Sequence, residues 1–390
     1  MINIENGDPI LLTKALIKCR SVTPKNDGAI EQLSHWLKEL NFECNILKFK
    51  EEGTEDIVNL WARIGNDEGP ALCFAGHTDV VPEGDSSNWS SDPFAANEVD
   101  GRIVGRGATD MKGAIASFVS ATKRFLEEEE NFVGSISFII TGDEEGIAIN
   151  GTKKLLNWMN ENNISFDDCI VGEPTNPKIL GEMIKIGRRG SVNGTITVNG
   201  EQGHVAYPHL ANNPIPILLN ILKSLTANQL DQGNEHFQPS NIEITSVDVG
   251  NTATNVIPQS ASANFNIRYN DSFTSKTIED EINKRLENFK NDFTLELSHS
   301  GDSFLTKPGK FVNNLSEIIY EKTGVNPELS TSGGTSDARF IKNHGNVVEF
   351  GLISKTMHQI DESVSLENIN DLTEISVSYT HLTLPTKRIV

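Results

Sequence analysis

The sequence predicts an α/β protein, in which a mostly parallel, twisted sheet flanked by helices is interrupted by an inserted ferredoxin-like domain. Short apolar runs alternate with amphipathic helical segments in the two outer parts of the chain. The middle part follows the order β-α-β-β-α-β instead. We therefore expect one large domain formed by residues 1–180 and 298–376, an inserted domain at residues 181–297, and a separate tail at residues 377–390.

The outer parts contain the predicted helices and buried strands of the large domain. Apolar residues recur at helical spacing from Ala29 to Leu40 and from Ala114 to Phe125. The runs Ala71–Ala75, Ser135–Ile140 and Cys169–Val171 are short and apolar, as buried strands are. Strands and helices that alternate at this length favour a sheet with helices on both faces. Ligands of such sheets bind at the carboxyl ends of the strands, which is where we expect a site.

The middle part contains four predicted strands and two predicted helices. From Val192 to Val198, apolar and polar residues alternate, which is typical of a half-buried strand. The other elements are a helix at Ile215–Leu225, strands at Ile242–Val249 and Ala263–Tyr269, a helix at Ile278–Phe289 and a strand at Phe293–Leu297. Their order is that of a ferredoxin-like unit, and its position in the chain makes the large domain discontinuous.

Composition is that of an ordinary globular protein and excludes some classes of partner. Of the 390 residues, 37% are hydrophobic and 22% are charged. The sequence contains no run of about 18 apolar residues, so we expect no membrane-spanning helix. The formal net charge of −21 argues against nucleic acid, which requires a basic surface. An acidic N-terminal segment without an apolar core, and four cysteines without paired spacing, lead us to expect a cytoplasmic protein with reduced thiols.

The tail at residues 377–390 differs from the sequence before it. A run rich in Thr and Leu replaces acidic, helix-like sequence and is followed by the basic pair Lys387–Arg388. Because the run fits no helix period, we interpret it as a non-native or disordered tail, with a genuine terminal strand as the alternative. His381 is therefore not counted as a metal ligand.

The segment Phe74–Pro82 places His77 and Asp79 two residues apart at the end of an apolar run. Alternate residues of an extended chain point the same way, and a carboxylate that holds an imidazole often stands next to a metal ion. A purely structural His–Asp pair would have the same spacing. The metal interpretation is favoured because further acids and a histidine stand where other apolar or small-residue segments end: Asp110, Glu144, Glu145, Glu173 and His358.

The candidate metal ligands are two histidines and three carboxylates: His77, Asp110, Glu145, Glu173 and His358. This mixed nitrogen and oxygen set suits zinc, and also cobalt or manganese. Five ligands exceed what one tetrahedral site with an open position needs, but they fit two ions about 3.5–4 Å apart that share a carboxylate. Glu144, next to Glu145, is then left as a general base for amide hydrolysis. A solvated acidic turn is the alternative for these two glutamates.

Three of these motifs resemble those of the dinuclear-zinc aminoacylase/carboxypeptidase (M20-type) superfamily of amidohydrolases: Gly76–Pro82, Gly105–Gly113 and Asp143–Gly146. A second set is similar to the succinyl-diaminopimelate desuccinylase family within that superfamily: Ile186–Ser191, Gly203–His209 and Ser332–Phe340. The resemblance extends from Ile10 to Ile375. Its first set of motifs is specific to the superfamily, and its second set largely to the narrower family.

The resemblance implies how the five ligands divide between two zinc ions per chain, one of which cobalt can replace. Asp110 would bridge the ions. His77 and Glu173 would complete one site, and Glu145 and His358 would complete the other.

The resemblance implies three further catalytic roles. Asp79 would orient His77, and Glu144 would take the proton from the water between the ions. The inserted domain would form a homodimer, in which His204 reaches the active site of the partner as an oxyanion donor. A surface histidine is the alternative for His204. The peptide bond between Asp110 and Met111 would be cis.

The substrate implied by the resemblance is a small anion that ends in carboxylates. Arginine binds carboxylates through paired hydrogen bonds, and Arg188 and Arg268 are the candidates. A solvated structural role is the alternative for Arg268. The resemblance implies polar support from five residues: Ser191, Tyr207, Asn255, Gly334 and Thr335. One position departs from the family pattern, because Ser354 stands four residues before His358, where the family has asparagine.

The expected activity is hydrolysis of N-succinyl-LL-2,6-diaminopimelate to succinate and LL-2,6-diaminopimelate, a step of lysine and diaminopimelate biosynthesis. The enzymatic alternative is a related N-acyl-amino-acid deacylase, such as one that acts on N-acetylornithine. A metal-free binding protein of the same fold is a weaker alternative, because all candidate ligands and the candidate base are present in this sequence.

Overall fold

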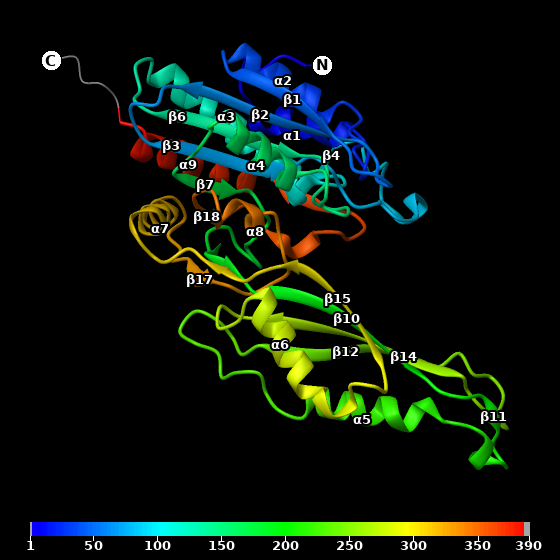
Figure 1. Ribbon diagram of the computed structural model, residues 1–390. Coiled ribbons are helices and arrows are strands. Elements are labelled where there is room, and N and C mark those ends of the chain that lie inside the picture. The colour runs from blue at the N-terminus through cyan, green and yellow to red at the C-terminus, as the bar shows by residue number, and fades with distance from the viewer. Residues whose placement is uncertain (1, 386–390) are drawn as a thin grey trace. The chain divides into compact units, whose positions relative to one another are not determined.

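The computed structural model describes residues 2–385, which form two compact units. Unit 1 comprises the described residues up to Ile186, Thr306–Ser330 and those from Ser336 onward; unit 2 comprises Gly187–Leu305 and Thr331–Thr335. Both are drawn in Figure 1. Within residues 2–385, none of the helices has both the length and the apolar character that a bilayer-spanning segment needs.

Unit 1 is built on an eight-stranded sheet. In spatial order its strands are β1 (Glu43–Phe49), β2 (Ile57–Gly65), β6 (Ser135–Thr141), β3 (Ala71–His77), β7 (Asp168–Val171), β18 (Asn346–Glu349), β8 (Met183–Lys185) and β17 (Glu328–Ser330). The central strands β6, β3, β7 and β18 are parallel, whereas β1, β2 and β6 pair in antiparallel fashion. The mostly parallel sheet that the sequence predicts is therefore present.

Helices flank the sheet on both faces. They are α1 (Pro9–Lys18), α2 (Ala29–Glu39), α3 (Gly113–Glu128), α4 (Thr152–Glu161), α7 (Lys310–Thr323), α8 (Ala338–Ile341) and α9 (Leu366–Thr383). Phe118 of α3 stacks on Phe74 of β3, with 4.5 Å between ring centroids. Trp158 of α4 instead packs against Trp61, which lies on the opposite face of the sheet. Short strands β4 (Asn97–Val99), β5 (Arg102–Val104) and β19 (Ser363–Ser365) form a separate small sheet.

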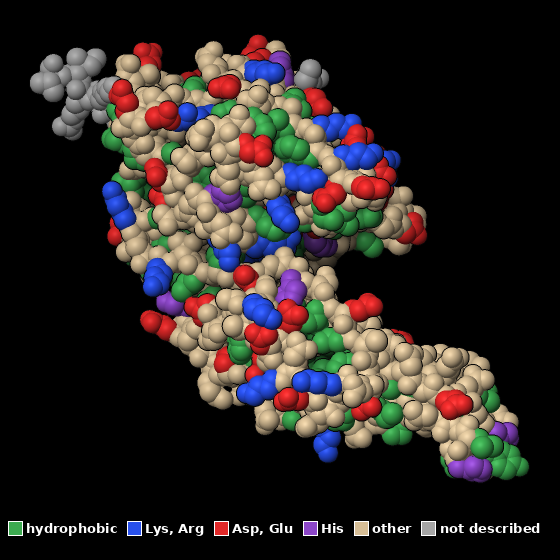
Figure 2. Space-filling view, viewed as in Figure 1, with side chains coloured by type: hydrophobic (Ala, Val, Ile, Leu, Met, Phe, Trp, Pro, Cys, Tyr) green, Lys and Arg blue, Asp and Glu red, His purple; other side chains and the backbone are tan. Residues whose placement is uncertain are grey.

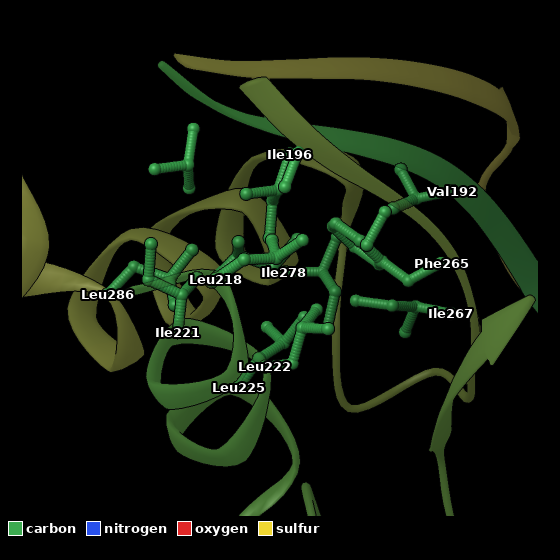
Figure 3. Packing of buried hydrophobic residues seen from close by; sticks show 14 of the residues in the cluster. Val192, Ile196, Leu218, Ile221, Leu222, Leu225, Phe265, Ile267, Ile278 and Leu286 are labelled. Atoms are coloured by element: carbon green, nitrogen blue, oxygen red, sulfur yellow. The ribbon is translucent and has the colours of Figure 1, made fainter. Parts of the chain in front are cut away.

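Unit 2 contains the ferredoxin-like arrangement that the middle of the sequence predicts. Its main elements are β10 (Gly190–Asn199), α5 (Pro214–Thr226), β12 (Asn241–Asp248), β14 (Ser260–Tyr269), α6 (Ser275–Arg285) and β15 (Thr294–Gly301). The strands form an antiparallel sheet in the order β12-β14-β10-β15. Figure 3 shows its core, where side chains of α5 and α6 pack on Val192, Ile196 and Phe265 of the sheet.

Unit 2 also carries two pairs of very short strands. They are β11 (Gly203–His204) with β13 (Val256–Ile257), and β9 (Gly187–Arg188) with β16 (Phe304–Leu305). The segment predicted as an insertion, residues 181–297, starts a few residues earlier than unit 2, because β8 joins the large sheet. It also ends earlier, because β15 continues to Gly301.

The interpretation of residues 377–390 as a tail that fits no helix was wrong for residues 377–383, which complete α9. Val377, Tyr379 and Leu384 are buried, and Thr380 donates a hydrogen bond from Oγ1 to the carbonyl of Ser376 at 2.7 Å. This bond to the preceding turn lets a threonine be buried inside a helix. Residues 386–390 lie outside the described part of the chain.

On the face seen in Figure 2, acidic side chains are not gathered in one place. Figure 2 shows Asp and Glu side chains interspersed with Lys and Arg on the viewed face, rather than gathered into one acidic area. Such a distribution is that of a solvated surface.

Candidate metal centre

The five predicted metal ligands come together in unit 1, from segments far apart in the sequence. His77 is the last residue of β3, Glu145 follows β6, and Glu173 follows β7. His358 follows β18 after a loop. These four positions are at or beyond carboxyl ends of parallel strands, as predicted. Asp110 differs, because it lies in the segment Ala108–Lys112, between the small sheet and the start of α3.

Two overlapping triads account for all five residues. Ligand atoms of His77, Asp110 and Glu173 lie within 4.8 Å of one another, and so do those of Asp110, Glu145 and His358. A further triad joins His77 to Glu144 and Glu145. His77 Nε2 is 3.8 Å from Glu173 Oε1, and His358 Nε2 is 2.8 Å from Glu145 Oε1. Imidazole and carboxylate ligands in this number fit two neighbouring divalent cations.

Asp110 is common to both triads and directs one oxygen toward each. Its Oδ1 is 3.2 Å from His77 Nε2, and its Oδ2 is 3.1 Å from His358 Nε2. The peptide bond between Asp110 and Met111 is cis, as the resemblance implies. His358 has a left-handed backbone conformation, with φ of 62°, which is uncommon outside glycine.

The raised pKa values of His77 and His358 indicate that the carboxylates of the cluster lack enough positive charge around them. Hydrogen bonds to Asp110 and Glu145 raise the pKa of His358 to about 10. Burial lowers the pKa of His77, but its hydrogen bond to Asp110 and the charges of Glu144 and Glu173 outweigh this and leave the pKa well raised. Cations bound by these ligands would take the place of the protons.

Asp79 holds the neighbouring loop more directly than it holds His77. His77 Nδ1 donates a hydrogen bond to the backbone carbonyl of Asp79 at 2.8 Å. The carboxylate of Asp79 is farther away, with Oδ1 at 3.7 Å from the same nitrogen. The carboxylate oxygens accept hydrogen bonds from the backbone N–H groups of Glu144, at 3.2 Å, and Glu145, at 3.0 Å. Burial raises the pKa of Asp79 to about 6. Asp79 therefore connects the first histidine with both glutamates.

Comparison with known proteins places this site in a family. Residues 73–381 match the peptidase family M20/M25/M40. The chain belongs to this family. Succinyl-diaminopimelate desuccinylases of Rhodospirillum centenum and Methylorubrum populi are 52% and 54% identical to it. These alignments cover 94% and 95% of this chain, and 95% and 97% of the relatives. Both levels of the resemblance, to the superfamily and to the narrower family, are confirmed.

Solved structures of M20 proteins have the same fold at low sequence identity. The metallo-carboxypeptidase Sso-CP2 of Sulfolobus solfataricus superposes with a TM-score of 0.76 at 17% identity, over 95% of this chain and 98% of that one. YXEP of Bacillus subtilis, described as a dinuclear metal-binding peptidase, gives a TM-score of 0.67 at 18% identity, over 96% of this chain and 97% of that one.

Two further residues of this M20 chain, Arg106 and Glu362, hold the segments that carry Asp110 and His358. The sequence analysis assigned no role to either of them. Glu362 Oε1 accepts from the backbone N–H groups of Thr109, at 3.0 Å, and Asp110, at 3.1 Å. Its Oε2 accepts from Arg106 Nη1 at 2.7 Å, and Arg106 also donates to the carbonyl of His358 at 3.4 Å. This buried ion pair holds the segment of Asp110 and the loop of His358 together. Glu362 has no motif of its own, so only the fold reveals it.

The predicted carboxylate-binding residues lie in unit 2 of the M20 chain. Arg188 is half-buried in β9 and donates to the carbonyl of Ser332 at 3.3 Å. Arg268 in β14 is paired with Ser191 of β10 and donates from Nε to Asn266 at 3.0 Å. Burial lowers the pKa of Arg268, and the charge of Arg189 lowers it further. Gly334 and Thr335 belong to the short segment of unit 2 that follows Ser330.

The predicted oxyanion donor also lies in unit 2. His204 is exposed in β11, and its Nδ1 accepts from the backbone N–H of Ala206 at 3.0 Å. Tyr207 is 56% exposed, with its ring centroid 5.7 Å from that of His204. The carbonyl of Asn255 accepts from Val205 N at 3.0 Å. These three residues therefore form one exposed group within unit 2.

Ser354, the position that departs from the family pattern, lies in unit 1 on the His358 loop. It begins a single 3-10 turn, Ser354–Thr356, and its Oγ donates to the carbonyl of Asn176 at 3.3 Å. The hydroxyl thus ties the loop to the segment that follows Glu173.

Proposed function

We propose that the chain is a metal-dependent amidohydrolase that cleaves N-succinyl-LL-2,6-diaminopimelate into succinate and LL-2,6-diaminopimelate. The observation that carries this proposal is the pair of ligand triads that share Asp110. The names of the relatives that are 52–54% identical over most of both chains supply the substrate. These names favour N-succinyl-LL-2,6-diaminopimelate over N-acetylornithine as the substrate.

The two triads would hold two divalent cations, zinc in both sites or cobalt in one. Such ions supply electrostatic stabilisation of developing negative charge and lower the pKa of water. The chain provides two histidines and three carboxylates for them, with Asp110 between the two sites. Asp79 and the Arg106–Glu362 pair keep these ligands in place through the backbone hydrogen bonds of their loops.

Glu144 is the proposed general base. Burial raises the pKa of its carboxyl well above the usual value, and the charge of Glu173 raises it further, whereas His77 lowers it. Divalent cations nearby would oppose this rise. A carboxylate that faces the ligand cluster without being one of the five ligands can accept the proton of the attacking water and return it to the leaving amine.

Substrate carboxylates would be bound by Arg188 and Arg268, with Ser191, Gly334 and Thr335 as hydrogen-bonding partners. Support comes from the half-buried side chains of both arginines, which cost less entropy to order than fully exposed ones. His204, Tyr207 and Asn255 would act in the site of a second copy, within a homodimer formed through unit 2. Strand β12 is an edge of its sheet and exposes Ile244 and Val247, which supports pairing with another chain.

The activity is tested by product analysis of purified, metal-loaded protein. N-succinyl-LL-2,6-diaminopimelate should give succinate and LL-2,6-diaminopimelate. N-acetylornithine has one carboxylate where the succinylated substrate has three, so the half-buried arginines would be left without partners, and it should react at least about 10²-fold more slowly in kcat/KM. Removal of metal by a chelator should abolish turnover, and added zinc should restore it. Faster release of acetate from N-acetylornithine would overturn the substrate assignment.

A further inference from the structure

One face of the sheet in unit 2 carries a row of polar side chains that includes Arg268. The residue before it in β14, Ile267, packs into the core with side chains of α5 and α6 (Figure 3). Successive side chains of a strand point to opposite faces, so Arg268 lies on the face turned away from these helices. Its register partners are Ser191 of β10 on one side and Asn241 of β12 on the other. Side chains of such partners share a face of the sheet.

A second arginine, Arg189, reaches across this row. It directly precedes β10, and its Nη1 donates to Asn241 Oδ1 at 3.1 Å. Strand β14 lies between β10 and β12, so the side chain of Arg189 crosses β14 to make this bond. The crossing point is at Arg268, because Arg268 is the register partner of Asn241. The two guanidinium groups are therefore neighbours on one face of the sheet.

These two neighbouring cations have no acidic partner among residues 2–385. Within the same residues, Arg268 donates only from Nε, to Asn266 at 3.0 Å, and Arg189 only from Nη1, to Asn241. Glu243, two residues after Asn241 in β12, accepts from Asn241 Nδ2 at 3.4 Å instead. Burial lowers the pKa of Arg268, and the charge of Arg189 lowers it further. The pair is thus a local excess of positive charge in an acidic protein.

Both arginines retain donor groups that a ligand can reach. Each side chain is half-buried, but Nη1 and Nη2 of Arg268 and Nη2 of Arg189 are not enclosed, whereas Nε of Arg189 is. Like charges that are partly removed from water repel each other, so an anion that joins them is favoured. Guanidinium groups donate paired hydrogen bonds to the two oxygens of a carboxylate. The free donors of this pair therefore suit a carboxylate.

We propose that Arg189 and Arg268 together bind one carboxylate of the substrate, and that Arg189 is a specificity-determining residue. The identity of the substrate rests on the proposed function, whereas the carboxylate site rests on unit 2 alone. Arg188, the residue before Arg189, is directed elsewhere, because its Nη1 donates to the carbonyl of Ser332. An acylated amino acid that places no carboxylate between Arg189 and Arg268 leaves two repelling cations unpaired, so the pair selects against it.

Arg189→Gln tests this assignment in the metal-loaded protein. It should raise KM for N-succinyl-LL-2,6-diaminopimelate at least about tenfold and change kcat little, because a carboxylate away from the scissile amide is held equally in the ground and transition states. Arg189→Lys keeps the charge but loses the paired donors, so its KM should be intermediate. Lys223→Gln removes an exposed charge of α5 in the same unit and should change neither constant. An unchanged KM in Arg189→Gln would overturn the proposal.

A second measurement does not depend on turnover. Thermal unfolding of the metal-loaded protein is followed with sodium succinate as the probe and sodium chloride of equal ionic strength as the reference. Succinate should raise the Tm of wild type and of Lys223→Gln, because a ligand of the folded state stabilises it. The rise should be at most about half as large in Arg189→Gln. A wild type that leaves the succinylated substrate intact would refute the proposed function alone. Equal rises in wild type and Arg189→Gln would refute the carboxylate site.

Discussion

At the scale of single residues, the proposed chemistry depends on two adjacent glutamates with different tasks. Glu145 Oε1 is 2.8 Å from His358 Nε2 and belongs to the triad that includes Asp110. Glu144 is absent from both triads that contain Asp110, although it lies close to His77. The irregular loop after β6 allows this divergence, because neither a strand nor a helix fixes the directions of successive side chains there.

Glu144→Gln tests the role of the base. Glutamine has the same shape but cannot accept the proton, so turnover should fall at least about 10²-fold while two metal ions per chain remain bound. The measurements are kcat with the succinylated substrate and metal content by elemental analysis.

Glu145→Gln is the matched control one residue away. It removes a proposed ligand, so it should reduce metal content, and Asp110→Ala should lose both ions. If Glu144→Gln lost metal and Glu145→Gln kept it, the roles given to the two glutamates would be exchanged. Full occupancy of both sites in Asp110→Ala would contradict a bridging role.

At the scale of elements, periodicity and residue type predicted most of the fold. Alternation from Val192 to Val198 gave β10, and the apolar runs Ser135–Ile140 and Cys169–Val171 gave β6 and β7. These patterns succeed because each element buries one face or both against its own sheet. The five candidate ligands were also predicted as one group, since each is an acid or a histidine that follows an apolar or small-residue segment.

Local sequence patterns did not predict two features, the contact of Glu362 with Asp110 and the end of α9. Glu362 supports Asp110 across about 250 residues of sequence, and nothing near it marks that contact. The end of α9 was missed because Val and Thr are weak helix formers. Its buried residues nevertheless pack against α3 and α7, and tertiary packing outweighs intrinsic helix propensity.

Tyr379 tests whether the end of α9 is an integral part of unit 1. Its side chain is 1% exposed, and its ring centroid is 5.9 Å from that of Phe311 in α7. Tyr379→Ala should lower the free energy of unfolding by about 3–5 kcal/mol, as removal of other large buried aromatic side chains does. Urea denaturation followed by circular dichroism gives this value.

Leu382→Ala is the control on the same turn of the helix. Leu382 is 53% exposed, so its removal should change the free energy of unfolding by less than about 0.5 kcal/mol. Equal stability of Tyr379→Ala and wild type would mean that the last turns of α9 are dispensable, as the interpretation of this segment as a foreign tail requires.

At the scale of the whole molecule, the proposed catalytic and binding roles are divided between residues of unit 1 and residues of unit 2. The metal ligands and the base belong to unit 1, whereas the candidate carboxylate-binding residues and His204 belong to unit 2. The net charge of −21 would repel an anionic substrate, so its capture would require local positive charge, which the proposed metal ions and the proposed arginines of unit 2 would supply.

His204→Ala tests the contribution of unit 2. An oxyanion donor acts mainly in the transition state, so its loss should lower kcat about 10²–10³-fold and change KM little. Because His204 is exposed, the variant should fold as the wild type does, and the proposed dimerisation and metal binding should be unchanged. Gel filtration and metal analysis check these conditions, and His299→Ala, which removes an exposed histidine of β15 in the same unit, should retain activity.

Mixing two inactive variants shows which chain His204 serves. In a heterodimer of His204→Ala and Glu144→Gln chains, one site combines the intact Glu144 of one chain with the intact His204 of the other. Half of the dimers are mixed after random exchange of equal amounts, and each has one working site of two, so activity should recover to about a quarter of wild type. Each variant alone should stay inactive. If mass spectrometry demonstrated mixed dimers but no activity returned, His204 would act within its own chain or have no catalytic role.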